Sequence, residues 1–118
     1  MDKKAVKNYF ISLQNEISTA LKSVDNKEFF VDKWDRPEGG GGESRIFADG
    51  DLIEKGGVNF SHVLGETMPS AATAKRPELL GASWEAMGVS LVIHPENPHV
   101  PTAPVSYTHL TLPTKQDV

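Results

Sequence analysis

Residues 87–94 read Met-Gly-Val-Ser-Leu-Val-Ile-His, and this stretch decides the fold. It is the clearest candidate for a buried β-strand in the sequence, because its apolar run is short and rich in strand-forming residues. The segment that follows, residues 95–102, contains Pro95, Pro98 and Pro101. Proline fixes φ and lacks an N–H group, so this segment ends the strand in an extended loop.

Further strands are predicted on the N-terminal side of this one. Residues 58–63 alternate as a strand, and residues 29–34 resemble a short strand of mixed exposure. Residues 49–50, Asp-Gly, stand between two apolar segments and predict a two-residue hairpin turn. Residues 56–57, Gly-Gly, permit a bulge or a sharp bend. Residues 65–80, rich in Pro, Ala, Ser and Thr, are expected to form a long loop.

Residues 3–24 predict an amphipathic helix with apolar residues at spacings of three and four. Asp2 is the expected N-cap, and residues 25–26, Asp-Asn, end the pattern. The polar side of this helix is expected to carry Lys7, Gln14, Asn15, Ser18 and Lys22. One helix followed by several hairpin-connected strands, without βαβ alternation, predicts an α+β fold with an antiparallel sheet.

The composition of the chain argues against several classes of function. The chain has 118 residues, enough for one domain, and a formal net charge of -4 from 12 Lys+Arg and 16 Asp+Glu. A basic surface for nucleic acid is not expected, and no apolar run approaches the roughly 20 residues of a membrane span. The N-terminus has no signal-peptide pattern, which favours a cytoplasmic location. The absence of cysteine excludes disulfides, thiolate metal sites and a cysteine nucleophile.

The glycine run at residues 39–42 is flanked by Arg36 and Arg45. A phosphate loop is excluded because no Gly-Lys-Ser/Thr follows, and a dinucleotide fingerprint is excluded because a strand follows in place of a helix. Two interpretations remain open. The run is either a flexible loop or, with its two arginines, a clamp for a ligand that carries carboxylates.

The candidate chemical side chains are three histidines and one serine. His62, His94 and His99 lack the helical spacing of a zinc-protease motif, and a histidine at a strand end is most often structural. His94 has the strongest case, because it ends the apolar strand and shares one sheet face with Ser90. Their Cα atoms lie roughly 13 Å apart by strand spacing, which is too far for a Ser/His nucleophile pair.

Several collinear motifs together resemble a known family. They are Arg36-Pro-Glu-Gly-Gly-Gly-Gly-Glu-Ser-Arg45, Glu54-Lys-Gly-Gly-Val-Asn-Phe-Ser-His-Val63, Arg76-Pro-Glu-Leu79 and Glu85-Ala-Met-Gly-Val-Ser-Leu-Val-Ile-His-Pro-Glu-Asn-Pro-His-Val-Pro-Thr102. In this order they closely resemble the oxygen-dependent (aerobic) coproporphyrinogen-III oxidases. The resemblance runs from residue 5 to residue 103 and is more specific than any single motif.

The resemblance implies an enzyme of haem and porphyrin biosynthesis. Members of this family oxidatively decarboxylate the ring A and ring B propionates of coproporphyrinogen III to vinyl groups, giving protoporphyrinogen IX. O2 is the co-substrate, a divalent metal cation is commonly assigned to bacterial members, and no organic cofactor is needed. The expected protein is a cytoplasmic homodimer with a large antiparallel sheet flanked by helices. Ser90 is similar to the family's substrate-contacting serine, and His94 to its first metal-ligand histidine.

The resemblance breaks at position 104. The family pattern continues as Pro-Thr-x-His-x-Asn-x-Arg, whose histidine serves as proton donor or metal neighbour and whose Asn and Arg bind substrate. Pro101, Thr102 and Ala103 fit this pattern, but Pro104 stands where the histidine is expected. Proline can neither donate a proton nor ligate a metal, so no catalytic residue is assigned.

The C-terminal residues have a separate interpretation. Residues 105–114 are the translation of GTC TCT TAT ACA CAT CTG ACG CTG CCG ACG, which resembles the end of a transposon-type sequencing adapter. We therefore interpret residues 1–103 as the N-terminal portion of the oxidase domain and residues 104–118 as a non-native, adapter-derived tail. The fragment itself is expected to be inactive, because most ligands and the dimer surface of the family lie beyond it.

Two functions from other classes remain as alternatives. One is a tetrapyrrole-binding module without catalysis, and the other is a metal-dependent hydrolase that uses His62, His94 and His99. A His-x-Asn-x-Arg sequence after Ala103 in the native gene would favour the oxidase over the binding module. The hydrolase requires its three histidines to converge in space. No interaction with nucleic acid or a membrane is expected in any of these cases.

Overall fold

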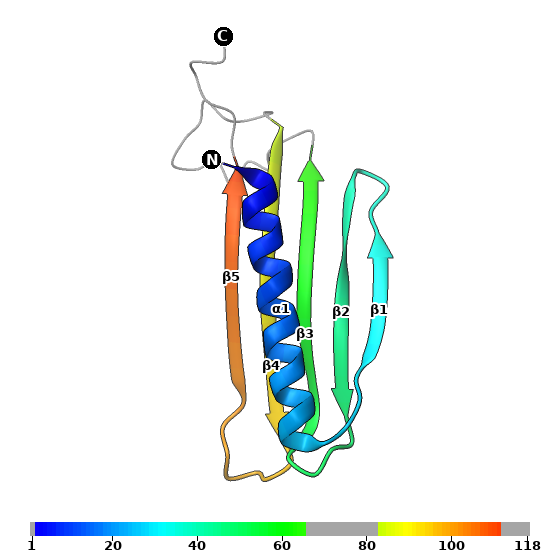
Figure 1. The fold of residues 1–118 in the computed structure, drawn as a ribbon, viewed down its shortest axis with the longest axis vertical. Coiled ribbons are helices and arrows are strands. Elements are labelled where there is room, and N and C mark those ends of the chain that lie inside the picture. The colour runs from blue at the N-terminus through cyan, green and yellow to red at the C-terminus, as the bar shows by residue number, and fades with distance from the viewer. Residues whose placement is uncertain (1, 66–82, 112–118) are drawn as a thin grey trace.

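The computed structural model describes residues 2–65 and 83–111, and all structural statements refer to this part of the chain. It contains an antiparallel sheet of five strands in sequential order, with one long helix across one face (Figure 1). The predicted α+β class with an antiparallel sheet is confirmed. The predicted loop at residues 65–80 lies outside the described residues except for Gly65. The elements are α1 (Lys3–Asp25), β1 (Phe30–Asp35), β2 (Gly40–Ala48), β3 (Ile53–Gly65), β4 (Trp84–Pro95) and β5 (Ala103–Thr111).

Helix α1 begins and ends where the sequence predicts. The Asp2 side chain accepts hydrogen bonds from the backbone N–H groups of Lys4 and Ala5, at 3.0 and 3.3 Å. At the other end Asn26 adopts the left-handed conformation at φ 50°, and its N–H donates to the Lys22 carbonyl. No helix in the described ranges is long and apolar enough to span a membrane.

The core lies between α1 and the sheet, in two apolar clusters. Phe10 of α1 packs with Phe60 of β3 and with Met87 and Val89 of β4. A second cluster, nearer the C-terminal end of α1, is formed by Phe47, Ile53 and Val58, with the partly buried Ile17, Leu21, Phe29, Leu91 and Ile93 around it. β4 is buried over residues 87–89 but is 37% exposed at Val92. The predicted buried strand is therefore buried on one face, because α1 covers one face of the sheet.

The expectation that Gln14 and Ser18 lie on the polar side of the helix is wrong. Both are buried, at 2% and 1% exposure. They follow Phe10 at intervals of four and so share its face of α1. Gln14 is accommodated there because its Nε2 donates to the carbonyls of Glu43 and Val58, at 2.9 and 3.1 Å. The amide ties the helix to β2 and β3.

The β2–β3 hairpin has a longer turn than the predicted two residues. Residues 49–52 connect the strands, with Asp49 at φ 58°. Asp25, at the end of α1, accepts hydrogen bonds from the N–H groups of Leu52 and Ile53, at 2.9 and 3.2 Å. This contact holds the turn against the end of α1. The register shift of β3 lies between Ile53 and Lys55, and the predicted bulge at residues 56–57 is wrong, because both glycines pair regularly with β2 and β4.

The flexible-loop interpretation of the glycine run is wrong for residues 40–42, which begin β2 and pair with β3. Gly39 and Gly40 have positive φ angles of 117° and 90°, so the tight turn from β1 into β2 requires glycine there. A Cβ on Gly42 would lie 2.4 Å from both the Trp34 ring and the Phe60 carbonyl oxygen. The run is therefore needed for close packing of the hairpin.

Candidate functional site

The sheet has two different faces within the described residues. Along β4, Met87 and Val89 point into the core beneath α1, so alternation places Ser90 and His94 on the opposite face. We call this the open face, because among the described elements α1 lies only against the other one (Figure 1). The predicted sharing of one face by Ser90 and His94 agrees with this register.

A row of polar residues crosses the open face at the level of Ser90. Ser90 pairs with Asn59 of β3, Asn59 with Ser44 of β2, and Ser44 with Asp32 of β1. On the other side Ser90 pairs with Ser106 of β5. Alternation in every strand places these side chains on the same face. We call Ser44, Asn59 and Ser90 the donor row. Sequence analysis found only Ser90, because the other members are recognisable only through the strand register.

Glycines leave the open face low around the donor row. Gly57 precedes Asn59 by two residues, and Gly88 pairs with Ser61 in the next row. On the other side of Ser61 the Trp34 ring covers Gly42. A Cβ placed on Gly57 would lie 3.5 Å from the Asn59 amide oxygen, so the amide leans over this glycine. Next to the row, a hollow of about 200 Å³ is lined by Ser90, Leu91 and Val92 of β4 and by Pro104, Val105 and Ser106 of β5. These three residues of β5 belong to the segment that we interpret as a non-native tail. A flat ligand can therefore approach the backbone closely here.

His94 stands at the end of the open face, opposite Lys55 of β3. Its Nδ1 lies 3.4 Å from the Thr102 Oγ1 in the loop before β5. No group of three or more His, Cys, Asp or Glu side chains suited to a metal ion occurs among residues 2–65 and 83–111. Around His94 the described residues therefore do not fit a complete coordination set.

The three histidines of the hydrolase alternative do not converge. His62 pairs with Met87 and His94 with Lys55, so seven residues of β4, roughly 23 Å of strand, separate their positions. His62 lies on the α1 side of the sheet, whereas His94 lies on the open face. His99 lies in the β4–β5 loop, where its N–H donates to the Asn97 side chain at 2.9 Å. This geometry contradicts a shared metal site.

The predicted carboxylate clamp of Arg36 and Arg45 is also contradicted. Arg45 lies 2.9 Å from Glu43 and places its guanidinium 5.5 Å from the centre of the Phe29 ring. Arg36, in the β1–β2 turn, pairs with Glu38 at 3.4 Å and donates to the Leu64 carbonyl at 3.3 Å. Both guanidinium groups thus have partners within the protein. The β1–β2 register separates them along the hairpin.

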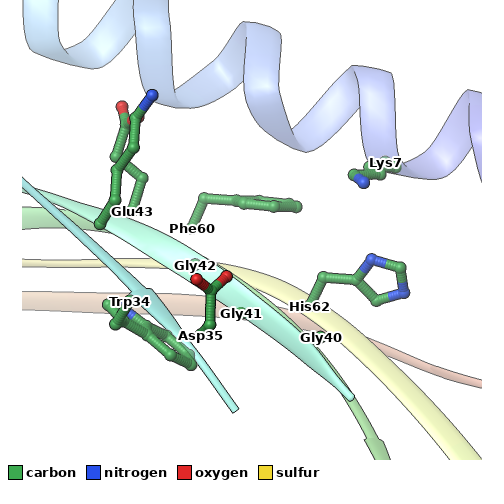
Figure 2. A pocket seen from close by; sticks show the side chains of 10 residues that line it. Lys7, Trp34, Asp35, Gly40, Gly41, Gly42, Glu43, Phe60 and His62 are labelled. Carbon is green, nitrogen blue, oxygen red and sulfur yellow. The ribbon is translucent and has the colours of Figure 1, made fainter. Parts of the chain in front are cut away.

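A second hollow, of about 390 Å³, lies on the α1 side, and Figure 2 shows it from close by. Asp35 and Glu43 point toward α1 in this view, and Trp34 lies on the other side of the strands. The hollow combines acidic and basic side chains, and no single ligand charge is favoured by them. Its full lining is Lys7, Lys33, Trp34, Asp35, Gly40, Gly41, Gly42, Glu43, Phe60 and His62.

Beside this hollow an ion-pair network holds the N-terminus of α1 to the sheet. Glu85 of β4 lies 2.5 Å from the His62 Nε2 and 3.0 Å from the Lys3 Nζ. The hydrogen bond with His62, followed by that with Lys3, holds the pKa of Glu85 below its ordinary value of 4.5. The network accounts for the place of His62 without a metal ion. Sequence analysis missed it, because Lys3, His62 and Glu85 are far apart in the chain.

The open face and its donor row lie in the segments that carry the sequence motifs. The model of the family described as coproporphyrinogen III oxidase matches residues 5–118, which is nearly the whole chain. The match includes the helix, all five strands and both candidate residues on the open face, Ser90 and His94. The chain belongs to the coproporphyrinogen III oxidase family.

Proposed function

We propose that the protein from which this sequence comes is an oxygen-dependent coproporphyrinogen-III oxidase that converts coproporphyrinogen III to protoporphyrinogen IX. The observation that carries this proposal is the family match over residues 5–118. In each of two steps a propionate, one on ring A and one on ring B, becomes a vinyl group. The propionate, one O2 and one proton give the vinyl group, CO2 and H2O2, so the substrate loses two electrons and O2 gains them.

The open face is our candidate for the substrate surface. Coproporphyrinogen combines apolar pyrrole rings with four carboxylates, so its site needs both apolar area and hydrogen-bond donors. Ser90 offers a hydroxyl at the centre of the open face, and Val92 offers apolar surface beside it. Gly57 beside the donor row carries no side chain, which lets the rings approach the sheet there. These features support a role for Ser90 in substrate binding.

His94 is proposed as one ligand of a divalent metal cation. Its position at the end of the open face supports this role, because an imidazole there can reach a ligand that lies over Ser90. Since the described residues do not form a complete set, further ligands would have to come from other parts of the protein. We also propose a cytoplasmic homodimer that works without an organic cofactor. A complete enzyme of this kind needs a proton donor, for which position 104 offers only Pro104.

The test uses the uninterrupted gene, read past codon 103 by a method independent of sequencing adapters. We expect the purified full-length protein to consume O2 and release CO2 from coproporphyrinogen III. Ser90→Ala should raise KM by about tenfold, the size expected for one lost hydrogen bond to a charged group. His99→Ala, in the β4–β5 loop, should change neither KM nor kcat. Tetrapyrrole binding without CO2 release would instead identify a non-catalytic binding module. If the protein does not bind the tetrapyrrole at all, both the oxidase and the binding module are contradicted.

A further inference from the structure

A second residue of the donor row, Asn59, is a candidate for substrate binding, an inference that rests on the proposed function. Asn59 lies directly opposite Ser90 in the β3–β4 pair, on the open face. Side chains at directly paired positions have Cβ atoms about 4.5–5.5 Å apart. An amide N–H and a hydroxyl at that separation can each donate to one oxygen of the same carboxylate.

The chemistry of the donor row favours an anionic group over a cation. Ser44, Asn59 and Ser90 are all half-buried and uncharged, and all three side chains can donate hydrogen bonds. Within the described residues, none of the three makes a side-chain hydrogen bond to another protein group. They are therefore available to a ligand. The exposed Asp32 marks the limit of the row, because its charge repels a carboxylate.

The position of the Asn59 amide adds a second observation. It leans over Gly57, with its oxygen 3.5 Å and its nitrogen 3.6 Å from the place of a Cβ on that glycine. The Asn59 amide thus lies against the position of Gly57, at an ordinary contact distance. An amide in this place, directly opposite Ser90, can meet a substituent of a ring system that lies on the open face.

We propose that Asn59 is a substrate-positioning residue that, together with Ser90, binds one propionate carboxylate of the tetrapyrrole and so fixes the macrocycle over the open face. Asn59 contributes its side-chain N–H, and Ser90 contributes its O–H. Ser44 continues the row on the side of β2 and can donate to the same group when the ligand shifts. Asn59 carries no proton during the reaction, so its effect is on binding.

The experiment uses the full-length oxidase from the uninterrupted gene. Asn59→Ala should raise KM for coproporphyrinogen III by about tenfold, with a smaller change in kcat. Asn59→Asp should raise it further, because the new carboxylate repels the propionate. Asn15→Asp, the matched change at an exposed position of α1, should leave KM unchanged. Asn59→Ser keeps a hydrogen-bond donor, so its KM should lie between those of the wild type and Asn59→Ala. A folded and active Asn59→Ser protein also shows that the site tolerates substitution.

A binding measurement separates a lost carboxylate contact from a general disturbance of the sheet. The probes are coproporphyrin III and its tetramethyl ester, titrated by fluorescence. The free acid should bind Asn59→Asp at least about tenfold more weakly than wild type, whereas the ester should bind both proteins equally. An active wild type whose KM is unchanged in Asn59→Ala and Asn59→Asp overturns the proposal for Asn59 alone. A wild type without oxidase activity overturns the proposed function instead.

Discussion

At the scale of single residues, Glu85 illustrates how one carboxylate connects distant segments. It lies on β4, and its carboxylate forms ion pairs with His62 of β3 and with Lys3 in the first turn of α1. Its side chain is 15% exposed and that of His62 20%, whereas Lys3 is 57% exposed. Because both partners favour the ionised carboxylate, the pKa of Glu85 is lowered. The position of the helix N-terminus therefore depends on the charge of this group.

This lowered pKa predicts a dependence of stability on pH. A group whose pKa is depressed by folding stabilises the protein above its unfolded value, here near 4.5, and loses that contribution as pH falls through the folded value. We expect Glu85→Gln to lower the free energy of unfolding at pH 7 by about 1 kcal/mol and to flatten its slope below pH 4.5. Chemical denaturation of the full-length protein from pH 3 to pH 7 measures both.

Glu28→Gln is the matched control, because Glu28 pairs with Lys22 at 2.8 Å but is 76% exposed. An exposed ion pair contributes little, so this variant should retain the wild-type acid slope. Equal slopes for Glu85→Gln and wild type would contradict the role given to the network.

At the scale of elements, the β1–β2 hairpin depends on a glycine, Gly42, at a position where a Cβ atom would not fit. The Trp34 ring covers Gly42, and the Phe60 carbonyl of β3 approaches it from the other strand. The Phe60 carbonyl is part of the paired backbone, so it cannot retreat without disturbing strand pairing. Gly57, four residues before Ser61, the partner of Gly42 on β3, faces only the flexible Asn59 amide at an ordinary contact distance. Two strand glycines in one sheet are therefore expected to differ sharply in tolerance.

We predict that Gly42→Ala destabilises the full-length protein by about 1–3 kcal/mol, the cost of overpacking, whereas Gly57→Ala changes stability by less than about 0.5 kcal/mol. Thermal unfolding of both variants and wild type measures the difference. The same loss of stability in both variants would show that the contacts of Gly42 are not the cause.

At the scale of the whole molecule, the open face exposes apolar side chains beside the donor row. Phe30, Ile46 and Val92 are 68%, 40% and 37% exposed. β5 forms one edge of the sheet, and its residues are almost all exposed, so its pairing with β4 relies on backbone hydrogen bonds. Such pairing requires no particular side chains, so a native and a non-native sequence could both form β5. The interpretation of residues 104–118 as an adapter-derived tail therefore stays a prediction.

We predict that the 118-residue chain, expressed alone, aggregates or remains partly unfolded and has no oxidase activity. An exposed sheet face and an unpaired edge favour association, and the chain offers neither a complete metal set among its described residues nor a histidine at position 104. Light scattering, a thermal melt and an assay with coproporphyrinogen III test this. A soluble monomer with a sharp cooperative melt would argue against it.

The local pattern of the sequence determined the elements. Apolar spacing with Asp2 and Asn26 at the ends predicted α1, alternation predicted β3, and a short apolar run predicted β4. Capping and side-chain patterns of this kind act between near neighbours in the chain. The shared face of Ser90 and His94 also follows from alternation within one strand. The family was predicted from collinear motifs, which require no knowledge of contacts.

Only the tertiary structure decided which residues meet across strands. The burial of Gln14, the lengthened turn held by Asp25, the pairing of both arginines with glutamates, and the row that joins Asn59 to Ser90 all depend on register between distant segments. A shift of one residue in that register would turn Asn59 toward α1 and away from the open face. Register depends on which face of each strand is buried and on the turns that join the strands, and no pattern within a single segment encodes both.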